Sequence, residues 1–300
     1  MINAVGVSKS FGEIQALSNI SLAIREQAVF GLIGTNGAGK STFLRLLSGV
    51  LQVDSGQILI EEQPVYENPA VKQSFFFIPD APYFFANSRP ADLRDYYATV
   101  YADFDKQQFN HLLSAFDLSP TRKINTFSKG MKKQLAIICA LSAHTRYIFC
   151  DETFDGLDPV MRQGVKSLFA EAMAERGLTP VIASHNLREL EDICDHVGLL
   201  HQGGMLLTRD VEGLKLGVHK VQAVFAPPLR EKEDFADLRV ESLKHSGALH
   251  IMIVQGEREQ VERQLAAYDP LYMEILPLTL EEVFLYETEV VGYDIKSLLL

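Results

Sequence analysis

A glycine-rich stretch near residue 40 constrains the fold of this chain more than any other feature. It reads Gly34-Thr35-Asn36-Gly37-Ala38-Gly39-Lys40-Ser41-Thr42 and fits the P-loop pattern G-x-x-x-x-G-K-[ST] without a gap. The apolar run 28–33 before it favours a buried strand, and the residues after it are apolar at helical spacing. The stretch therefore predicts a strand, a glycine loop and a helix in that order, which is the context that a P-loop requires.

The residue types of this loop suit the binding of phosphate. Glycine lets the backbone approach a ligand closely and take a positive φ, and free N–H groups at a helix N-terminus attract an anion. Lys40 is then expected to reach the β- and γ-phosphates of a nucleotide, and the hydroxyl of Ser41 to bind Mg²⁺. The alternative interpretation is a glycine-rich turn that carries a solvated lysine.

Length, charge and cysteine content narrow the possible classes of protein. The 300 residues suffice for one large or two modest domains, and the formal net charge of -11 argues against a broad nucleic-acid footprint. The three cysteines, Cys139, Cys150 and Cys194, form no close pair, which argues against a disulfide framework or a zinc site and suits a reducing cytosol. Since no apolar run approaches ~18 residues, the sequence predicts no membrane span.

A pair of carboxylates follows the apolar run 147–150. Asp151 and Glu152 end a predicted buried strand, which is costly unless something compensates their charge. In a P-loop protein the compensation is Mg²⁺ and a polarised water, so we expect Asp151 in the magnesium shell and Glu152 beside the water. The alternative is two solvated carboxylates. His185 ends the next predicted strand, on the edge where α/β proteins bind ligands, although a lone histidine is usually structural.

The remainder of the first two thirds of the chain alternates between short strands and helices. Further strands are expected at 5–7, 20–24, 57–60, 75–78, 179–184 and 197–200, with turns at 11–12, 18–19 and 202–204. Helices are expected from Pro90, after the N-caps Asp105, Ser128 and Asp158, and over 187–195. The start of the helix after Ser128 is a possible second anion site, but many helices begin with serine and bind nothing.

The roles of one isolated aromatic residue and of one aromatic cluster stay open between binding and packing. Phe11 stands alone in a polar stretch before the P-loop, and it is either a stacking platform for a base or a half-buried strand residue. Asp80 lies between two prolines and therefore in a rigid loop. Tyr83, Phe84 and Phe85 follow in that loop, either as plugs of the core or as a docking patch.

The composition changes near residue 210. Beyond it the sequence has no further glycine loop and no carboxylate pair at a strand end. Strands are expected at 221–225, 239–243 and 249–254, and helices over 257–267 and 280–286. The segment from about 216 to 300 is therefore predicted to be a small α+β extension, to which the sequence assigns no chemistry.

Taken together, these features resemble the ATP-binding subunit of an ABC transporter. The resemblance covers about residues 2–215, and the motifs follow the family's own order: aromatic, P-loop, Pro-flanked loop, helical insert, signature helix, Walker B, D-loop and switch histidine. It implies an α/β P-loop NTPase fold with an N-terminal antiparallel β subdomain. The implied domains are an ABC ATPase domain over 1–215, with a helical subdomain at about 88–145, and an α+β accessory domain over 216–300.

The resemblance also implies roles for individual residues. The catalytic set is Lys40, the base Glu152, and His185 at the γ-phosphate. The residues implied to bind ATP, with Phe11 on adenine, are Phe11, Asn36, Gly37, Ala38, Gly39, Lys40, Ser41, Thr42, Ser128, Gly130 and Asp158. Those implied to hold Mg²⁺ are Ser41, Asp80 and the Walker B aspartate Asp151. In the family the signature residues serve the nucleotide on the other protomer, so a head-to-tail homodimer or heterodimer with two shared sites is implied.

Several positions depart from the family pattern. The signature reads Phe127-Ser128-Lys129-Gly130-Met131 where the family usually has Leu-Ser-Gly-Gly-Gln, and Thr35 and Thr153 replace prolines. Asp80 replaces the glutamine of the Q-loop; a carboxylate there still ligates Mg²⁺, but it repels the γ-phosphate if nothing neutralises it. With the C-terminal segment Leu278-Thr279-Leu280-Glu281-Glu282-Val283-Phe284, this degenerate signature and Q-loop are similar to single-domain subunits of exporter-type bacterial systems.

The expected function is ATP binding and hydrolysis that powers transport through a separate membrane subunit. The chain is expected to be cytoplasmic and peripheral on the inner face of the cell membrane, docked through Tyr83, Phe84, Phe85 and the helical insert. One alternative is a soluble ABC ATPase that remodels nucleic acid or ribosomes, which the single cassette, the lack of heptads and the charge oppose. A regulatory module with weak turnover is favoured by the odd signature and opposed by Glu152. A kinase is disfavoured because the carboxylate pair suits attack by water.

Overall fold

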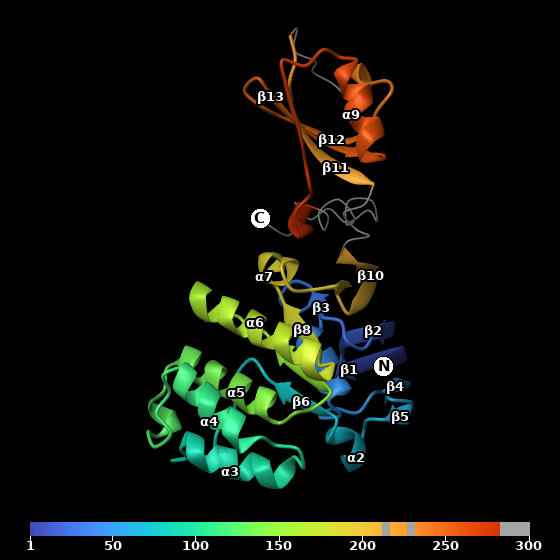
Figure 1. Ribbon diagram of the computed structural model, residues 1–300. Helices are drawn as coiled ribbons and strands as arrows, with labels where there is room; N and C mark the ends of the chain where they lie inside the picture. The colour runs from blue at the N-terminus through green and yellow to red at the C-terminus, as the bar shows by residue number, and fades with distance from the viewer. Residues whose placement is uncertain (212–216, 227–231, 283–300) are drawn as a thin grey trace. The chain divides into compact units, whose positions relative to one another are not determined.

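The computed structural model describes residues 1–211, 217–226 and 232–282 of the chain (Figure 1). The chain divides into two compact units, unit 1 over Met1–Thr208 and unit 2 over Arg209–Leu300. The sequence places the boundary between residues 215 and 216. Among the described residues, no helix combines the length and the apolar character needed to cross a membrane.

Unit 1 is a mixed α/β unit with strands and helices interleaved along the chain. Its elements are β1 (Ile2–Phe11), β2 (Ile14–Ile24), β3 (Phe30–Ile33), α1 (Lys40–Leu47), β4 (Ser55–Ile60), β5 (Gln63–Pro64), α2 (Pro69–Lys72), β6 (Phe75–Ile78), α3 (Pro90–Val100), α4 (Lys106–Ala115), the 3-10 helix η1 (Ile124–Thr126), α5 (Lys129–Ser142), β7 (Tyr147–Asp151), α6 (Pro159–Arg176), β8 (Thr179–Ser184), α7 (Leu187–Glu191), β9 (His196–His201) and β10 (Gly204–Asp210).

A six-stranded sheet in the order β10-β9-β3-β8-β7-β6 forms the centre of unit 1. Strands β9, β3, β8, β7 and β6 pair in parallel, and every residue of β3, β7 and β8 is buried, as expected for strands covered on both faces. Because parallel strands end at the same edge, the loops after β3, β7 and β8 meet there. The fold therefore brings the P-loop, the carboxylate pair and His185 to one edge of the sheet.

A second sheet of unit 1, in the order β2-β1-β4-β5, is antiparallel. Its first two strands are much longer than the sequence predicts, and the predicted turn at 18–19 is wrong because both residues lie inside β2. Asn19 has a φ of 50°, and the pairing of β1 with β2 shifts register between Val7 and Lys9. An irregularity of this kind absorbs the unusual φ without ending the ladder.

Helices α3, α4 and α5 lie together on one side of unit 1, away from β1, β2, β4 and β5 (Figure 1). The predicted N-caps are confirmed. Asp105 accepts hydrogen bonds from the first turn of α4, Ser128 accepts one from Met131 N in α5, and Asp158 caps α6. α6 ends at Gly177, whose φ of 69° suits a glycine. These caps succeed as predictions because each depends on neighbouring residues alone.

The predicted helix over 187–195 is too long, since α7 ends at Glu191. The chain then turns toward β9, and Asp195 fixes the turn against the start of β3. Its carboxylate accepts from Val29 N at 2.7 Å, and its own N–H donates to Val29 O at 3.0 Å. This tertiary pairing ends the helix before its apolar pattern does.

Unit 2 is an antiparallel sheet with one described helix of more than a single turn. Its elements are β11 (Val218–Val224), the 3-10 helix η2 (Lys232–Asp234), β12 (Arg239–Ser246), β13 (Leu249–Gln255), α9 (Arg258–Ala266) and β14 (Tyr272–Leu276). The strand order is β12-β13-β11-β14. Val261 and Leu265 of α9 join the apolar core of this sheet. β14 is not predicted from the sequence. Of the predicted helix over 280–286, only residues 280–282 lie within the described residues, where they are helical.

Candidate active site

The P-loop joins β3 to α1, as its sequence predicts. Gly37 and Gly39 have φ values of 81° and 108°, which suit glycine and strain other residues. Space imposes a second restriction at Gly39, where a Cβ atom would lie 2.6 Å from Ala16 O. The loop therefore passes so close to β2 that only glycine fits, and α1 starts directly after it at Lys40.

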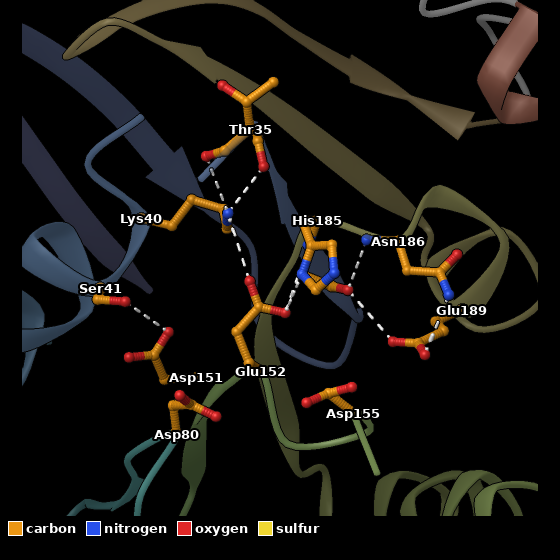
Figure 2. Close-up of polar contacts among 12 residues, drawn as sticks. Thr35, Lys40, Ser41, Asp80, Asp151, Glu152, Asp155, His185, Asn186 and Glu189 are labelled. Atoms are coloured by element: carbon orange, nitrogen blue, oxygen red, sulfur yellow. Dashed lines mark hydrogen bonds and ion pairs between the residues drawn. The ribbon is translucent and has the colours of Figure 1, made fainter. Parts of the chain in front are cut away.

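The ammonium of Lys40 lies between the P-loop and the end of β7. It donates hydrogen bonds to Gly34 O at 2.7 Å and Thr35 O at 3.2 Å, and it lies 3.3 Å from Glu152 Oε1 (Figure 2). Lys40 is only 5% exposed. A buried ammonium in this position offers a localised positive charge to a phosphate held by the loop.

Ser41 and Asp151 form the second contact between the P-loop helix and β7. The Ser41 hydroxyl donates to Asp151 Oδ1 at 2.9 Å, and Asp151 is 1% exposed. Burial raises the pKa of Asp151 above its ordinary value; the hydrogen bond from Ser41 opposes the shift, and the nearby charges of Glu152 and Asp80 add to it. A buried carboxylate with excess negative charge around it favours a cation as partner.

Glu152 faces Lys40 on one side and His185 on the other (Figure 2). Its Oε2 atom lies 2.8 Å from His185 Nδ1 and 3.4 Å from the backbone nitrogen of the same residue. The backbone of Glu152 is left-handed, with a φ of 47°, and its N–H donates to Ala183 O in β8. The two predicted catalytic side chains and the P-loop lysine are thus in one row of contacts.

Asp80 lies next to Asp151 (Figure 2) and has a partner that the sequence analysis missed. Lys133 of α5 places its Nζ 3.2 Å from Asp80 Oδ1. The same ammonium donates to Glu152 O at 2.5 Å and lies 3.9 Å from Asp155 Oδ2. Burial alone would raise the pKa of Asp155, but the hydrogen bond from Lys129 and the charge of Lys133 outweigh it and lower that pKa.

A second missed group surrounds the loop that follows His185. Glu189 is buried, and it accepts hydrogen bonds from Ser184 Oγ at 3.2 Å and Asn186 Nδ2 at 3.1 Å. Arg162 of α6 lies 3.3 Å from Glu189 and donates to Leu157 O. These contacts connect the loop after β8 to the loop that precedes α6.

The other predicted nucleotide residues lie outside this cluster. Phe11, at the end of β1, is 46% exposed, and Lys9 Nζ lies 5.7 Å from the centre of its ring. Ser128 and Asp158 are exposed and cap α5 and α6. Within residues 1–211, 217–226 and 232–282, no hydrogen bond or ion pair connects these three side chains to Lys40 or Glu152.

Comparison with known proteins gives the family. Residues 17–155 match the family model described as ABC transporter. The ABC transporter ATP-binding protein YtrB of Bacillus subtilis is 30% identical over 285 residues, which cover 95% of this chain and 97% of that protein. The chain belongs to the ATP-binding proteins of ABC transporters. The bacitracin transport ATP-binding protein BcrA of Bacillus licheniformis is 30% identical over 209 residues, 69% of this chain and 68% of that protein.

A solved structure supports the fold of this ABC ATP-binding protein. A dimeric ATP-binding cassette in a post-hydrolysis state, bound to ADP and Pi, aligns with a TM-score of 0.64 over 70% of this chain and 99% of that one, at 20% identity. The predicted α/β P-loop NTPase fold of the ABC type is therefore confirmed, as is the predicted family. As an ABC ATP-binding protein, the chain binds and hydrolyses ATP to power transport, and it works with membrane subunits.

The two missed groups of this ABC ATP-binding protein differ in how they could have been found. The sequence predicts that a carboxylate at Asp80 repels the γ-phosphate if nothing neutralises it, and this is a signal for a cation nearby. The helical pattern of α5 hid it, because the apolar face runs through Met131, Leu135 and Ile138 and leaves Lys133 on another side. Glu189 gave no comparable signal, since one glutamate in a short helix usually faces solvent.

Proposed function

We propose that the chain hydrolyses ATP at the edge of its parallel sheet with Glu152 as general base, within a head-to-tail dimer that drives a membrane subunit. The row of contacts from Lys40 through Glu152 to His185 carries the proposal. In this row the proposed phosphate-binding cation, the proposed base and an imidazole lie within direct reach of one another (Figure 2). Such preorganisation is the main contribution that a protein makes to phosphoryl transfer.

The P-loop and the first turn of α1 are the proposed phosphate site. The N–H groups of Lys40, Ser41 and Thr42 start the helix and have no intrahelical partner, so phosphate oxygens can accept from them. Asn36 and Gly37 are exposed at the top of the loop. Ala38 contributes through the shape of the loop, because its own N–H donates to Thr35 O at 3.1 Å.

Ser41 and Asp151 are the proposed ligands of Mg²⁺. Asp80, implied by the resemblance as a further ligand, is instead paired with Lys133, whose Nζ lies 3.2 Å from Asp80 Oδ1. The hydroxyl of Ser41 and the buried carboxylate of Asp151 are hard oxygen donors side by side, which fits this ion. In the part of the chain that the structure describes, no three His, Cys, Asp or Glu residues cluster as a metal cage. That agrees with Mg²⁺, which usually takes one or two carboxylates together with substrate phosphates. When bound, Mg²⁺ supplies charge neutralisation at the β- and γ-phosphate oxygens.

Glu152 is proposed to orient the attacking water and to take its proton. Its carboxylate has one oxygen toward Lys40 and the other toward His185, which supports a place for it beside the γ-phosphate that Lys40 is proposed to bind. His185 is half exposed, which leaves its ring accessible to the γ-phosphate. General-base assistance of this kind contributes about 10²- to 10⁴-fold to a rate.

The signature residues are proposed to act on a second protomer. Ser128 and Asp158 are exposed, and Gly130 is partly so. A similar cassette is known as a dimer bound to ADP and Pi. We propose that Phe11 stacks on the adenine of its own site, while Ser128, Gly130 and Asp158 face the nucleotide of the partner. Two nucleotide sites are then shared between two chains, which are either identical or related.

The first test is steady-state ATP hydrolysis of the purified chain against protein concentration. The rate per protomer should rise steeply with concentration, because each site needs a residue from the second chain. Glu152→Gln should lower kcat about 10²- to 10⁴-fold and accumulate as an ATP-held dimer in size-exclusion chromatography. A rate per protomer that stays constant over the whole concentration range would reject the shared site.

The surface proposed to contact the membrane subunit is a row of aromatic rings beside the Asp80 loop. Tyr83 is 82% exposed and Phe85 52% exposed, whereas Phe84 is half-buried. The rings of Tyr83 and Phe85 lie 6.2 Å apart, and the row continues 5.3 Å further to Tyr96 of α3. Exposed aromatic rings in a row are typical of a binding surface.

Replacing Tyr83, Phe84 and Phe85 together by alanine tests this surface. Recruitment of the chain to membranes that contain the transporter should be lost, while ATP binding stays. Tyr66→Ala, which removes an exposed ring elsewhere, is the control and should leave recruitment unchanged. Full recruitment of a folded triple variant would remove the proposal. A peripheral, cytoplasmic location at the inner face of the membrane follows from the same proposal, and the exporter-type direction stays a prediction.

A further inference from the structure

Lys133 is a buried charge that the proposed chemistry does not use. Its side chain is 1% exposed, and burying an ammonium is costly unless it is paired. The groups that pair with Lys133 Nζ come from two different loops. Asp80 Oδ1, in the loop after β6, lies 3.2 Å from it, and Glu152 O, directly after β7, lies 2.5 Å from it. Asp155 Oδ2 lies 3.9 Å away. One side chain of α5 thus joins the Asp80 loop to the residue proposed as general base.

The backbone of Glu152 needs such support. A non-glycine residue at a φ of 47° is strained and persists only where its surroundings fix it. The nitrogen of Glu152 is fixed by Ala183 O at 3.0 Å, and its carbonyl accepts from Lys133 and, at 3.2 Å, from Asp155 N. This conformation turns the carboxylate toward Lys40 and His185. Lys133 provides the only side-chain donor to that carbonyl among the described residues.

The charge of Lys133 has a second consequence at Asp80. A carboxylate in this loop, close to Asp151 (Figure 2), repels a γ-phosphate unless a cation neutralises it. Lys133 is that cation. The ion pair of Asp80 and Lys133 carries no net charge, so it restores the neutrality that a glutamine would give at this position of the loop.

We propose that Lys133 is a positioning residue for ATP hydrolysis, which holds the carbonyl of Glu152 so that its carboxylate faces Lys40 and His185, and which cancels the charge of Asp80. The inference rests on the proposed role of Glu152 as general base. A purely stabilising role predicts an equal loss of folded protein in every background. A positioning role predicts a loss of kcat that depends on Glu152.

Lys133→Met is the first variant to measure, because methionine fills a similar volume without a charge or a donor. We expect kcat to fall between about 10-fold and 100-fold, as for a base displaced by a fraction of an ångström to one ångström. The KM for ATP should change less than about twofold, since Lys40 and the P-loop are intact. Lys132→Met is the matched control from the next position of α5, which is half-buried, and it should retain wild-type kcat. A wild-type kcat in Lys133→Met would overturn the proposal.

A double-mutant cycle with Glu152→Gln shows whether Lys133 acts through Glu152. In single-turnover measurements Lys133→Met should change the residual rate of Glu152→Gln less than about twofold, because there is no base left to position. An equal fold-loss in both backgrounds would overturn the positioning role. Glu152→Gln is measured before any Lys133 variant. If it retains the wild-type rate, then Glu152 is not the general base.

A second pair of variants tests whether Lys133 neutralises the charge of Asp80. Adding Asp80→Asn to Lys133→Gln removes the unneutralised carboxylate, so the double variant should recover at least about threefold of the kcat lost by Lys133→Gln alone. Glutamine keeps an N–H donor but is one bond shorter than lysine, so the part of the loss that comes from the weakened contact with Glu152 O should remain. This pair of amides also serves if Lys133→Met does not fold, because it removes the unpaired carboxylate of Asp80 and keeps polar side chains at both positions. A double variant that is no faster than Lys133→Gln would overturn the neutralising role.

Discussion

Units 1 and 2 differ in what they bury. The buried side chains of unit 1 include five charged ones, Lys40, Lys133, Asp151, Lys166 and Glu189, whereas the described part of unit 2 buries one polar side chain, His250. Three of the five charges line the candidate site. A buried charge lowers stability unless it is well paired, so these charges cost unit 1 stability that their partners must offset. The apolar core of unit 2 serves the fold of that unit.

The largest expected effect on stability comes from removing a buried aromatic ring from the core of unit 2. Phe235 is fully buried, with ring contacts to Phe225 at 5.5 Å and Tyr268 at 5.3 Å. Phe235→Ala should lower the free energy of unfolding of unit 2 by about 3–5 kcal/mol, measured by denaturant titration. ATP hydrolysis at 25 °C should stay within twofold of wild type. The exposed Leu271→Ala is the control. A parallel loss of hydrolysis would show that unit 2 is not only structural.

Next in size is the removal of a charge from unit 1. Lys40→Met should lower kcat about 10²- to 10³-fold, which is the usual effect of losing one group that stabilises developing charge. Thermal unfolding of unit 1 should change little. Lys220→Met in unit 2, which breaks the ion pair with Glu282 at 2.6 Å, is the matched lysine control and should leave kcat unchanged. Equal losses in both variants would erase the contrast between the units.

The smallest expected effect on stability comes from Asp151→Asn, which should stabilise the fold while it lowers turnover. Asp151→Asn should abolish most activity and yet raise the free energy of unfolding, on the order of 1 kcal/mol. The pKa of Asp151 is raised by burial, so the folded state binds the proton more tightly than the unfolded state. Wild-type stability relative to the variant therefore falls as pH rises from about 4, the ordinary value, and levels off above the raised pKa.

Thermal unfolding of the wild type and of Asp151→Asn between pH 4 and pH 8 measures that difference. Other titrating groups are common to both proteins and cancel. The variant should gain most at the upper end of this range. A variant that is less stable than wild type at pH 8 would mean that the hydrogen bond between Ser41 and Asp151 outweighs the cost of burial.

The parts of the site that sequence predicts well are local. The caps at Asp105, Ser128 and Asp158 depend on a side chain and the N–H groups two or three residues later, so adjacent residues suffice. The P-loop is also local, since its glycines and its lysine all lie between Gly34 and Lys40. The meeting of Lys40 with Glu152 followed from topology, because loops after parallel strands share an edge.

The parts that sequence missed depend on tertiary approach. Lys133 is buried because the loops after β6 and β7 both come within reach of α5, and no spacing within α5 contains that information. The true length of β2 depends on its pairing with β1, which continues on both sides of Asn19, at Leu17 and at Ile20. β14 was missed because it is an edge strand whose partner, β11, lies far away in the sequence.

The close approach of β2 to Gly39 and Gly203 restricts how the sequence can evolve. A Cβ atom would lie 2.6 Å from Ala16 O if built on Gly39, and 2.8 Å from the same oxygen if built on Gly203. Every mutation of either codon that adds a side chain must therefore move the backbone of β2. Substitutions at these two positions should be eliminated in any descendant that keeps this loop, even one that has lost catalysis. Survival of Gly39 and Gly203 in a distant inactive homologue would therefore mark retention of the architecture independently of retention of the enzyme.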